Sequence, residues 1–159
     1  MTKYRTVFAC LTGVGCGVAY IYILAQLFGR VLVRNPIHLW LLERLAKTGH
    51  EAEYKIAVYL HDFLIYFIVA VPFAVVLSRL PPINSWKYLH VALATSLVLQ
   101  YWGPITDPAA LANLAELWQF YVGLGISILG LPLAFAAASA VNNRVIAPRK
   151  ERTANIGIE

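Results

Sequence analysis

His61 and Asp62 are the residues whose chemistry stands out, because both lie inside the apolar segment 51–80, which is long enough to cross a bilayer. A carboxylate at membrane depth costs about 2.5–3.5 kcal/mol on insertion scales, so it needs a partner or water. Asp62 stands about four residues into the apolar run, closer to one interface than to the midplane. It therefore marks the first functional-site hypothesis of the chain.

Three neighbours share the helix face of Asp62. Tyr59 precedes it by three residues, Tyr66 follows it by four, and Lys55 lies two turns back. Asp62 is predicted either as a structural acid bonded to the tyrosines or reaching toward Lys55, or as a proton or cation site that opens outward. His61 points about 100° away around the helix, which predicts that His61 and Asp62 do not form an acid–base pair.

The remaining histidines do not indicate a metal or a cofactor. His90 lies near the start of the apolar segment that follows, and successive antiparallel spans would place it and His61 in opposite leaflets, which argues against a haem between them. His38 and His50 lie in a polar loop and are expected at the surface, too scattered to form a zinc site. We therefore expect no metal site and no cofactor.

The composition is that of an integral membrane protein. Of the residues, 60% are hydrophobic and 13% charged, and the mean hydropathy is +0.66, whereas soluble domains are about 25% charged. The net charge of +5 comes from Lys and Arg at the ends of apolar segments, where they anchor to headgroups. No basic face with stacking aromatics is visible, so the expected partner is the lipid bilayer and not nucleic acid.

Four apolar segments predict four transmembrane helices. Their approximate ranges are 7–28, 56–79, 86–102 and 117–141. The third is short for a crossing, but Trp86 and Trp102 bracket it as an interfacial aromatic belt would. The predicted fold is all-α, an integral membrane bundle of four transmembrane helices in one domain.

Two short interfacial helices are predicted on one face of this bundle, at about 36–47 and 108–116. Asn35-Pro36 and Asp107-Pro108 supply an N-cap followed by proline at the first helical position. The first helix would lie in the headgroup plane or cover the end of the bundle. The last segment, 142–159, is predicted as a solvated cytoplasmic tail.

The basic residues in the short flanks predict the orientation. With both termini inside, the cytoplasmic flanks carry eight Lys and Arg residues and the outer flanks five. The loop at 103–116 has neither residue type, which supports the same answer. We therefore expect a plasma (inner) membrane protein with both termini in the cytoplasm and both short helices outside.

Small residues predict close helix packing in the first and fourth spans. The candidates are Gly13 and Gly17, which form a G-x-x-x-G pair, and Gly123, Ser127, Gly130 and Ala134. Cys10 and Cys16 match neither a redox pair nor a zinc pattern and are expected to pack beside them.

A repeated pattern indicates an internal duplication. The segment 35–45 reads N-P-I-H-L-W-L-L-E-R-L and the segment 107–117 reads D-P-A-A-L-A-N-L-A-E-L. The later spans share P-F-A and P-L-A at residues 72–74 and 132–134. If the duplication is real, both halves enter the membrane from the same side and form parallel repeats.

No catalytic motif or phosphate-binding loop is present, so an enzyme is not expected. The leading hypothesis is a non-enzymatic subunit or partner-binding protein that assembles through its small-residue faces, as a homo-oligomer or in a larger membrane complex. The second is an oligomeric small transporter or channel module that uses Asp62, with His61, Tyr59, Tyr66 and Lys55 around it. A membrane immunity or regulatory protein is the third.

Overall fold

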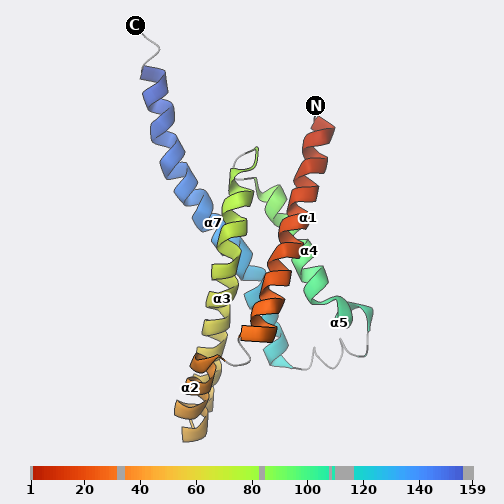
Figure 1. Ribbon diagram of the computed structural model, residues 1–159, viewed down its shortest axis with the longest axis vertical. Coiled ribbons are helices and arrows are strands. Elements are labelled where there is room, and N and C mark those ends of the chain that lie inside the picture. Colours follow the sequence, from red (N-terminus) through yellow and green to blue (C-terminus); the bar gives the residue numbers. More distant parts are fainter. Residues whose placement is uncertain (1, 32–34, 83–84, 108, 110–116, 156–159) are drawn as a thin grey trace.

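In the computed structural model, which describes residues 2–31, 35–82, 85–107, 109 and 117–155, the regular elements are helices (Figure 1). The all-α prediction is therefore confirmed for this part of the chain. In chain order the elements are α1 (Thr2–Gln26), the π-helical turn η1 (Leu27–Val31), α2 (Pro36–Arg44), the 3-10 turn η3 (Ala46–Thr48), α3 (Glu51–Arg79), α4 (Trp86–Gln100), α5 (Trp102–Thr106) and α7 (Trp118–Asn155).

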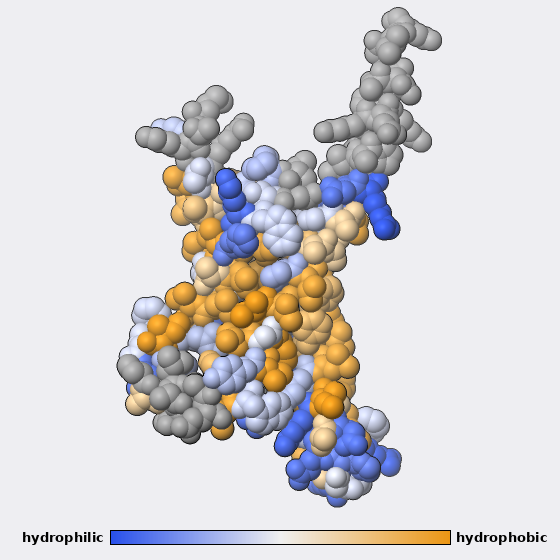
Figure 2. All heavy atoms as spheres, turned by 180° about the vertical axis from the view of Figure 1, so that it is seen from behind, coloured by the Kyte–Doolittle hydropathy of each residue, from blue (hydrophilic) through white to orange (hydrophobic). Residues whose placement is uncertain are grey.

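Three helical segments of the described chain are long and apolar enough to cross a bilayer: Thr6–Arg30, Glu51–Arg79 and Trp118–Arg144. Large apolar side chains such as Leu11 and Ile68 stand on their outer faces, where lipid replaces water. Figure 2 shows the resulting apolar belt around the middle of the molecule, with hydrophilic residues at both ends. The protein is therefore an integral membrane protein.

The fourth predicted span, 86–102, is not confirmed. Helix α4 has 15 residues, about 22 Å at 1.5 Å per residue, against a hydrocarbon core of about 30 Å. Pro104 explains why it stops, because a proline ring clashes with the carbonyl four residues earlier, here that of Gln100. The short helix α5 continues beyond a break at Tyr101.

The first predicted short helix is present as α2 and η3. The Asn35 side chain caps α2 by accepting a hydrogen bond from the Ile37 N–H at 2.9 Å, as predicted. Gly49, with φ of 87°, ends the turn in the left-handed region and sends the chain into α3. Helix α2 thus runs antiparallel to the first turns of α3, with Leu41 buried.

The second predicted short helix, 108–116, lies outside the described residues apart from Ala109. The Ala109 N–H donates to Asp107 Oδ1 at 3.0 Å, the same capping bond as that of Asn35. Helix α7 continues without a break to Asn155, so the segment predicted as a tail after residue 141 begins as helix.

The long helices associate as two parallel pairs, α1 with α4 and α3 with α7 (Figure 1). At Gly17 an added Cβ would lie 2.5 Å from the Ala92 carbonyl oxygen, and at Gly13 2.8 Å from Val91 Cβ. The absence of side chains is what lets α1 approach α4 so closely.

Some of the small residues of α7 lie at contacts with other helices, and one does not. Gly130 packs 3.2 Å from Tyr66 Cβ, measured from an added Cβ, and Ser127 and Ala134 are buried. At Gly123 an added Cβ would meet no described atom within 4 Å. Gly13, Gly17, Ser127, Gly130 and Ala134 thus lie at contacts between helices of this chain, whereas Gly123 meets no other described helix.

Gly17→Ala should destabilise the folded protein by about 1–3 kcal/mol, because even a methyl group overlaps the α4 backbone. The matched control is Gly15→Ala, where an added Cβ meets nothing within 4 Å. Thermal unfolding in detergent, followed by circular dichroism, measures both. Equal midpoints for the two variants would show that α1 does not approach α4 this closely.

Candidate functional site

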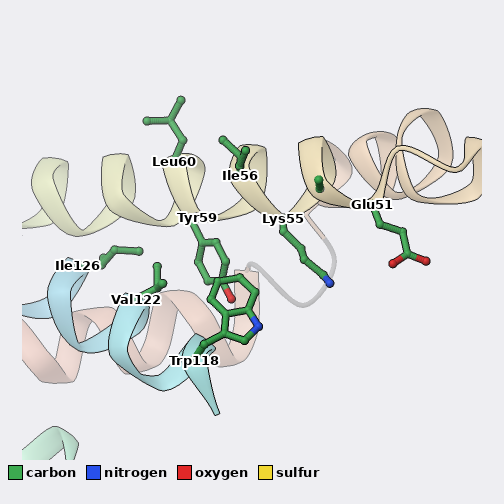
Figure 3. A pocket seen from close by; sticks show the side chains of 9 residues that line it. Glu51, Lys55, Ile56, Tyr59, Leu60, Trp118, Val122 and Ile126 are labelled. Atoms are coloured by element: carbon green, nitrogen blue, oxygen red, sulfur yellow. The ribbon is translucent and has the colours of Figure 1, made fainter.

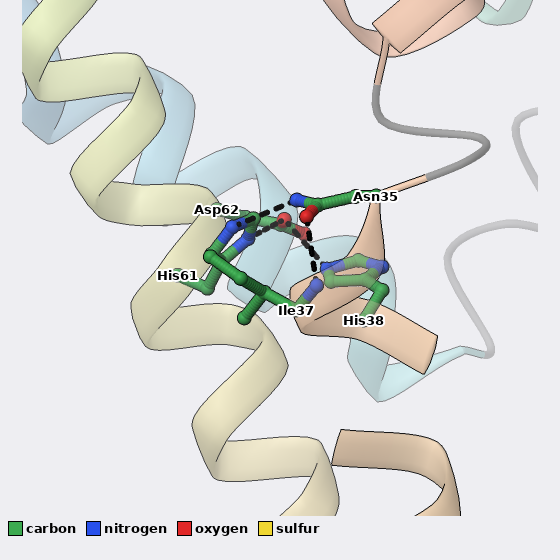
Figure 4. Close-up of polar contacts among 5 residues, drawn as sticks. All are labelled: Asn35, Ile37, His38, His61 and Asp62. Atoms are coloured by element: carbon green, nitrogen blue, oxygen red, sulfur yellow. Dashed lines mark hydrogen bonds and ion pairs between the residues drawn. The ribbon is translucent and has the colours of Figure 1, made fainter. Parts of the chain in front are cut away.

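Three side chains with metal-binding and proton-exchanging chemistry meet where the start of α2 packs against α3 (Figure 4). Asp62 Oδ1 lies 3.4 Å from His61 Nδ1 and 3.6 Å from His38 Nε2. The two imidazole rings have centroids 4.9 Å apart. We call His38, His61 and Asp62 the His–Asp cluster.

The His–Asp cluster is only partly shielded from solvent. The side chains of His38, His61 and Asp62 are 29%, 16% and 23% exposed. The His38 Nε2 atom itself is buried and has no hydrogen-bond partner among the described residues, with Asp62 as its charged neighbour. A buried polar atom in that state is costly, and most such atoms in folded proteins have a partner.

Asn35 determines the protonation pattern of His61. Its Oδ1 is occupied by the Ile37 N–H, so its Nδ2 is the atom that faces His61 Nε2, at 3.0 Å. An amide NH₂ can only donate, hence His61 Nε2 accepts and the ring proton sits on Nδ1. That proton points to Asp62 Oδ1. In this arrangement His61 accepts from Asn35 and donates to the carboxylate of Asp62.

The expectation that His61 and Asp62 point apart is wrong. Their Cβ atoms are separated by about 100° around α3, but both side chains flank the side of α3 that α2 covers, and they converge there. The expectation that His38 is a surface residue is also wrong, because α2 turns it onto α3.

Tyr59 and Lys55, predicted beside Asp62, lie elsewhere. They line a groove of about 760 Å³ between the starts of α3 and α7, with Glu51 near Lys55 and apolar residues deeper in (Figure 3). The Tyr59 ring packs edge-on against Trp118, with centroids 5.7 Å apart. The predicted contact of Asp62 with Lys55 or Tyr59 is therefore replaced by contacts with the two histidines.

Tyr66 belongs to a polar network inside the bundle. Gln100 Nε2 donates to Tyr66 Oη and to Ser127 Oγ, both at 3.0 Å. Ser127 Oγ in turn donates to the Gly123 carbonyl at 2.9 Å, and Tyr101 Oη lies 3.4 Å from Ser127 Oγ. This network ties α3, α4 and α7 together one helical turn beyond Asp62.

The two remaining histidines lie away from the His–Asp cluster. His50 is exposed and forms an ion pair of 3.5 Å with Glu53, so its predicted surface position is confirmed. His90 is exposed on α4, with its ring 6.4 Å from that of Trp86. Because α3 and α4 run in opposite directions, His90 and His61 lie toward opposite ends of the bundle (Figure 1).

Sequence reasoning missed Asn35 and His38 as members of the site. An available clue was the short hairpin: Gly49 stands almost midway between Asn35 and His61, so two antiparallel helices joined there bring these residues to one level. The prediction treated α2 as a separate interfacial element and so did not consider the pairing.

Comparisons of the chain with protein-family models, with curated proteins and with solved structures find no match. The chemistry of the site is therefore inferred from the side chains that form it. One carboxylate and two imidazoles converge within 4.8 Å of one another, and this donor set suits a bound cation.

Asn35→Asp should place a proton on His61 Nε2. An aspartate can accept from both the Ile37 N–H and His61 Nε2–H, so the cap is kept while the ring nitrogen that accepts in the native protein becomes a donor. Nitrogen-15 chemical shifts of histidine-labelled protein show whether Nε2 carries a proton. An Nε2–H tautomer of His61 already in the unmutated protein would contradict the assigned role of Asn35.

Proposed function

We propose that this protein is a small membrane transport or channel module whose cation site is Asp62 with His38 and His61. The observation that carries the proposal is the shared contact of Asp62 Oδ1 with both imidazoles, at 3.4 and 3.6 Å. Ionisable residues in membrane-spanning helices are rare, and they mark ion pathways and proton relays. The partial exposure of all three side chains leaves the site accessible from one end.

The polar groups beyond Asp62 support a path into the bundle. Tyr66, one turn further along α3, connects to Gln100 and Ser127. Past this network the interior is apolar and tightly packed, with Ala70, Leu131 and Phe135 at 0% exposure. A site open at one end and a packed barrier beyond it fit a transporter in a state closed to the other side.

The small-residue faces no longer support the hypothesis that the protein assembles with other chains through them. The faces of Gly13, Gly17 and Gly130 are occupied by helices of the same chain, so they are not available to a second copy. If the module works as an oligomer or within a larger complex, we propose that it assembles through other apolar faces. The subunit and the immunity or regulatory hypotheses have no contact in the described residues that favours them.

For the topology we propose four spans in the plasma (inner) membrane, with α4 and α5 together making the short crossing and both termini in the cytoplasm. The start of α1 and the described end of α7 lie at the same end of the molecule (Figure 1). The excess of Lys and Arg in the flanks on that side supports its cytoplasmic placement.

Cysteine labelling tests this topology. In a background of Cys10→Ser and Cys16→Ser, Thr106→Cys should react with a membrane-impermeant maleimide in intact cells. Lys87→Cys should react only after the cells are permeabilised. Both sites flank α4–α5, so labelling of both from one side would rule out a crossing there.

Asp62→Asn should abolish cation flux into liposomes that contain the purified protein, because the amide keeps the shape but not the charge. Flux of protons, Na⁺ and divalent cations is followed with enclosed indicator dyes. The matched control is Asp107→Asn, the same change at an exposed helix cap that asparagine also supports. Unchanged flux in Asp62→Asn, or no cation flux in the unmutated protein, would refute the proposed function.

A further inference from the structure

Two of the three distances between donor atoms in the His–Asp cluster are close to those of a metal site. Ligand atoms about 2.0–2.1 Å from a tetrahedral Zn²⁺ lie about 3.3 Å from one another. Asp62 Oδ1 lies 3.4 Å from His61 Nδ1 and 3.6 Å from His38 Nε2. The three donor atoms lie within 4.8 Å of one another, so a cation placed between them needs only small side-chain movements.

The burial and the surroundings of His38 Nε2 also favour a metal site. Its Nε2 atom is buried, lacks a hydrogen-bond partner among the described residues and is directed at Asp62. In the tautomer with its proton on Nδ1, His38 Nε2 offers a lone pair that a metal ion next to Asp62 would bind. Two imidazoles and one carboxylate form a donor set typical of divalent transition metals, in contrast to the all-oxygen sites of Mg²⁺ and Ca²⁺.

We infer that the His–Asp cluster is a binding site for a divalent transition-metal ion such as Zn²⁺, held by His38 Nε2, His61 Nδ1 and Asp62 Oδ1. Three protein ligands leave a fourth tetrahedral position open. This inference rests on the proposed function in one respect, since it names the class of cation that the Asp62 site would carry. The binding itself is independent of transport.

Asn35 limits the affinity of this site. Binding at His61 Nδ1 requires that atom to give up its proton, so the ring proton moves to Nε2 and faces the Asn35 NH₂ group. Two donors then oppose each other unless the amide turns over and sacrifices its bond to the Ile37 N–H. A ligand imidazole is normally supported by an acceptor at its other nitrogen. Asn35 is therefore expected to weaken metal binding at the native site.

The test is a titration of the full-length protein in detergent, purified without a polyhistidine tag, with Zn²⁺ in a calorimeter. The unmutated protein should bind one Zn²⁺ per chain. His38→Gln and Asp62→Asn should each weaken binding by more than about 100-fold, the upper end of the loss from a second-shell partner. The control His50→Gln removes an exposed histidine at the start of α3, about three helical turns before His61, and should leave the affinity unchanged.

The Asn35→Asp variant separates an effect on the metal site from misfolding, because tighter Zn²⁺ binding is expected and a misfolded protein would bind less. The aspartate accepts from both Ile37 N–H and His61 Nε2–H, so Zn²⁺ should bind about tenfold more tightly. Tetrahedral Co²⁺ absorption provides a second readout of the same site. No Zn²⁺ binding by the unmutated protein, equal losses in His50→Gln and His38→Gln, or weaker binding in Asn35→Asp would each overturn the inference.

The two proposals fail separately. Flux of protons or Na⁺ that depends on Asp62, without Zn²⁺ binding, would overturn the metal site and leave the proposed function standing. Zn²⁺ binding that depends on His38 and Asp62, without flux of any cation, would support the metal site and refute the transport function.

Discussion

The Asn35 side chain makes the pair of hydrogen bonds on which the site depends. Its oxygen caps α2 through the Ile37 N–H, and its nitrogen reaches His61 on α3. One residue thus begins a helix, joins that helix to its neighbour and sets the tautomer of an imidazole. Because the capping bond fixes the amide orientation, the three effects are inseparable. The position of His38, one turn into α2, follows from the same contact.

The bundle around this site is held together by helices whose backbones pack closely against one another. In a bilayer the hydrophobic effect gives little drive for helix association, so packing and interhelical hydrogen bonds must hold the helices together. Gly13 and Gly17 let α1 touch α4, and the buried Asn142 Nδ2 donates to Ser78 Oγ at 2.8 Å between α7 and α3. The polar contacts lie at different levels along α3, with an apolar core between them.

The parallel pairing of α1 with α4 and of α3 with α7 agrees with the predicted duplication, since parallel repeats give equivalent helices the same direction. The side chains of Asn35 and Asp107 also accept the same kind of hydrogen bond, from the backbone N–H two residues further on. The His–Asp cluster, however, belongs to one half alone. The corresponding residues of the second half are Ala110, Tyr121 and Val122. The polar site thus lies in one half of the chain.

The sequence by itself determined the fold class, three of the four predicted apolar spans as long helices and the cap at Asn35, and it marked Asp62 as a candidate site residue. These follow from composition, apolar length and residues within a few positions of one another, which act locally. It could not determine the partners of Asp62. They depend first on the antiparallel packing of α2 on α3, which brings His38 to Asp62 across 24 positions. They also depend on α7 and α4, because Tyr59 packs against Trp118 of α7 and Tyr66 bonds Gln100 of α4 instead of contacting Asp62. Only the tertiary structure decides such contacts, because helical spacing describes one helix and says nothing of which neighbour covers each face.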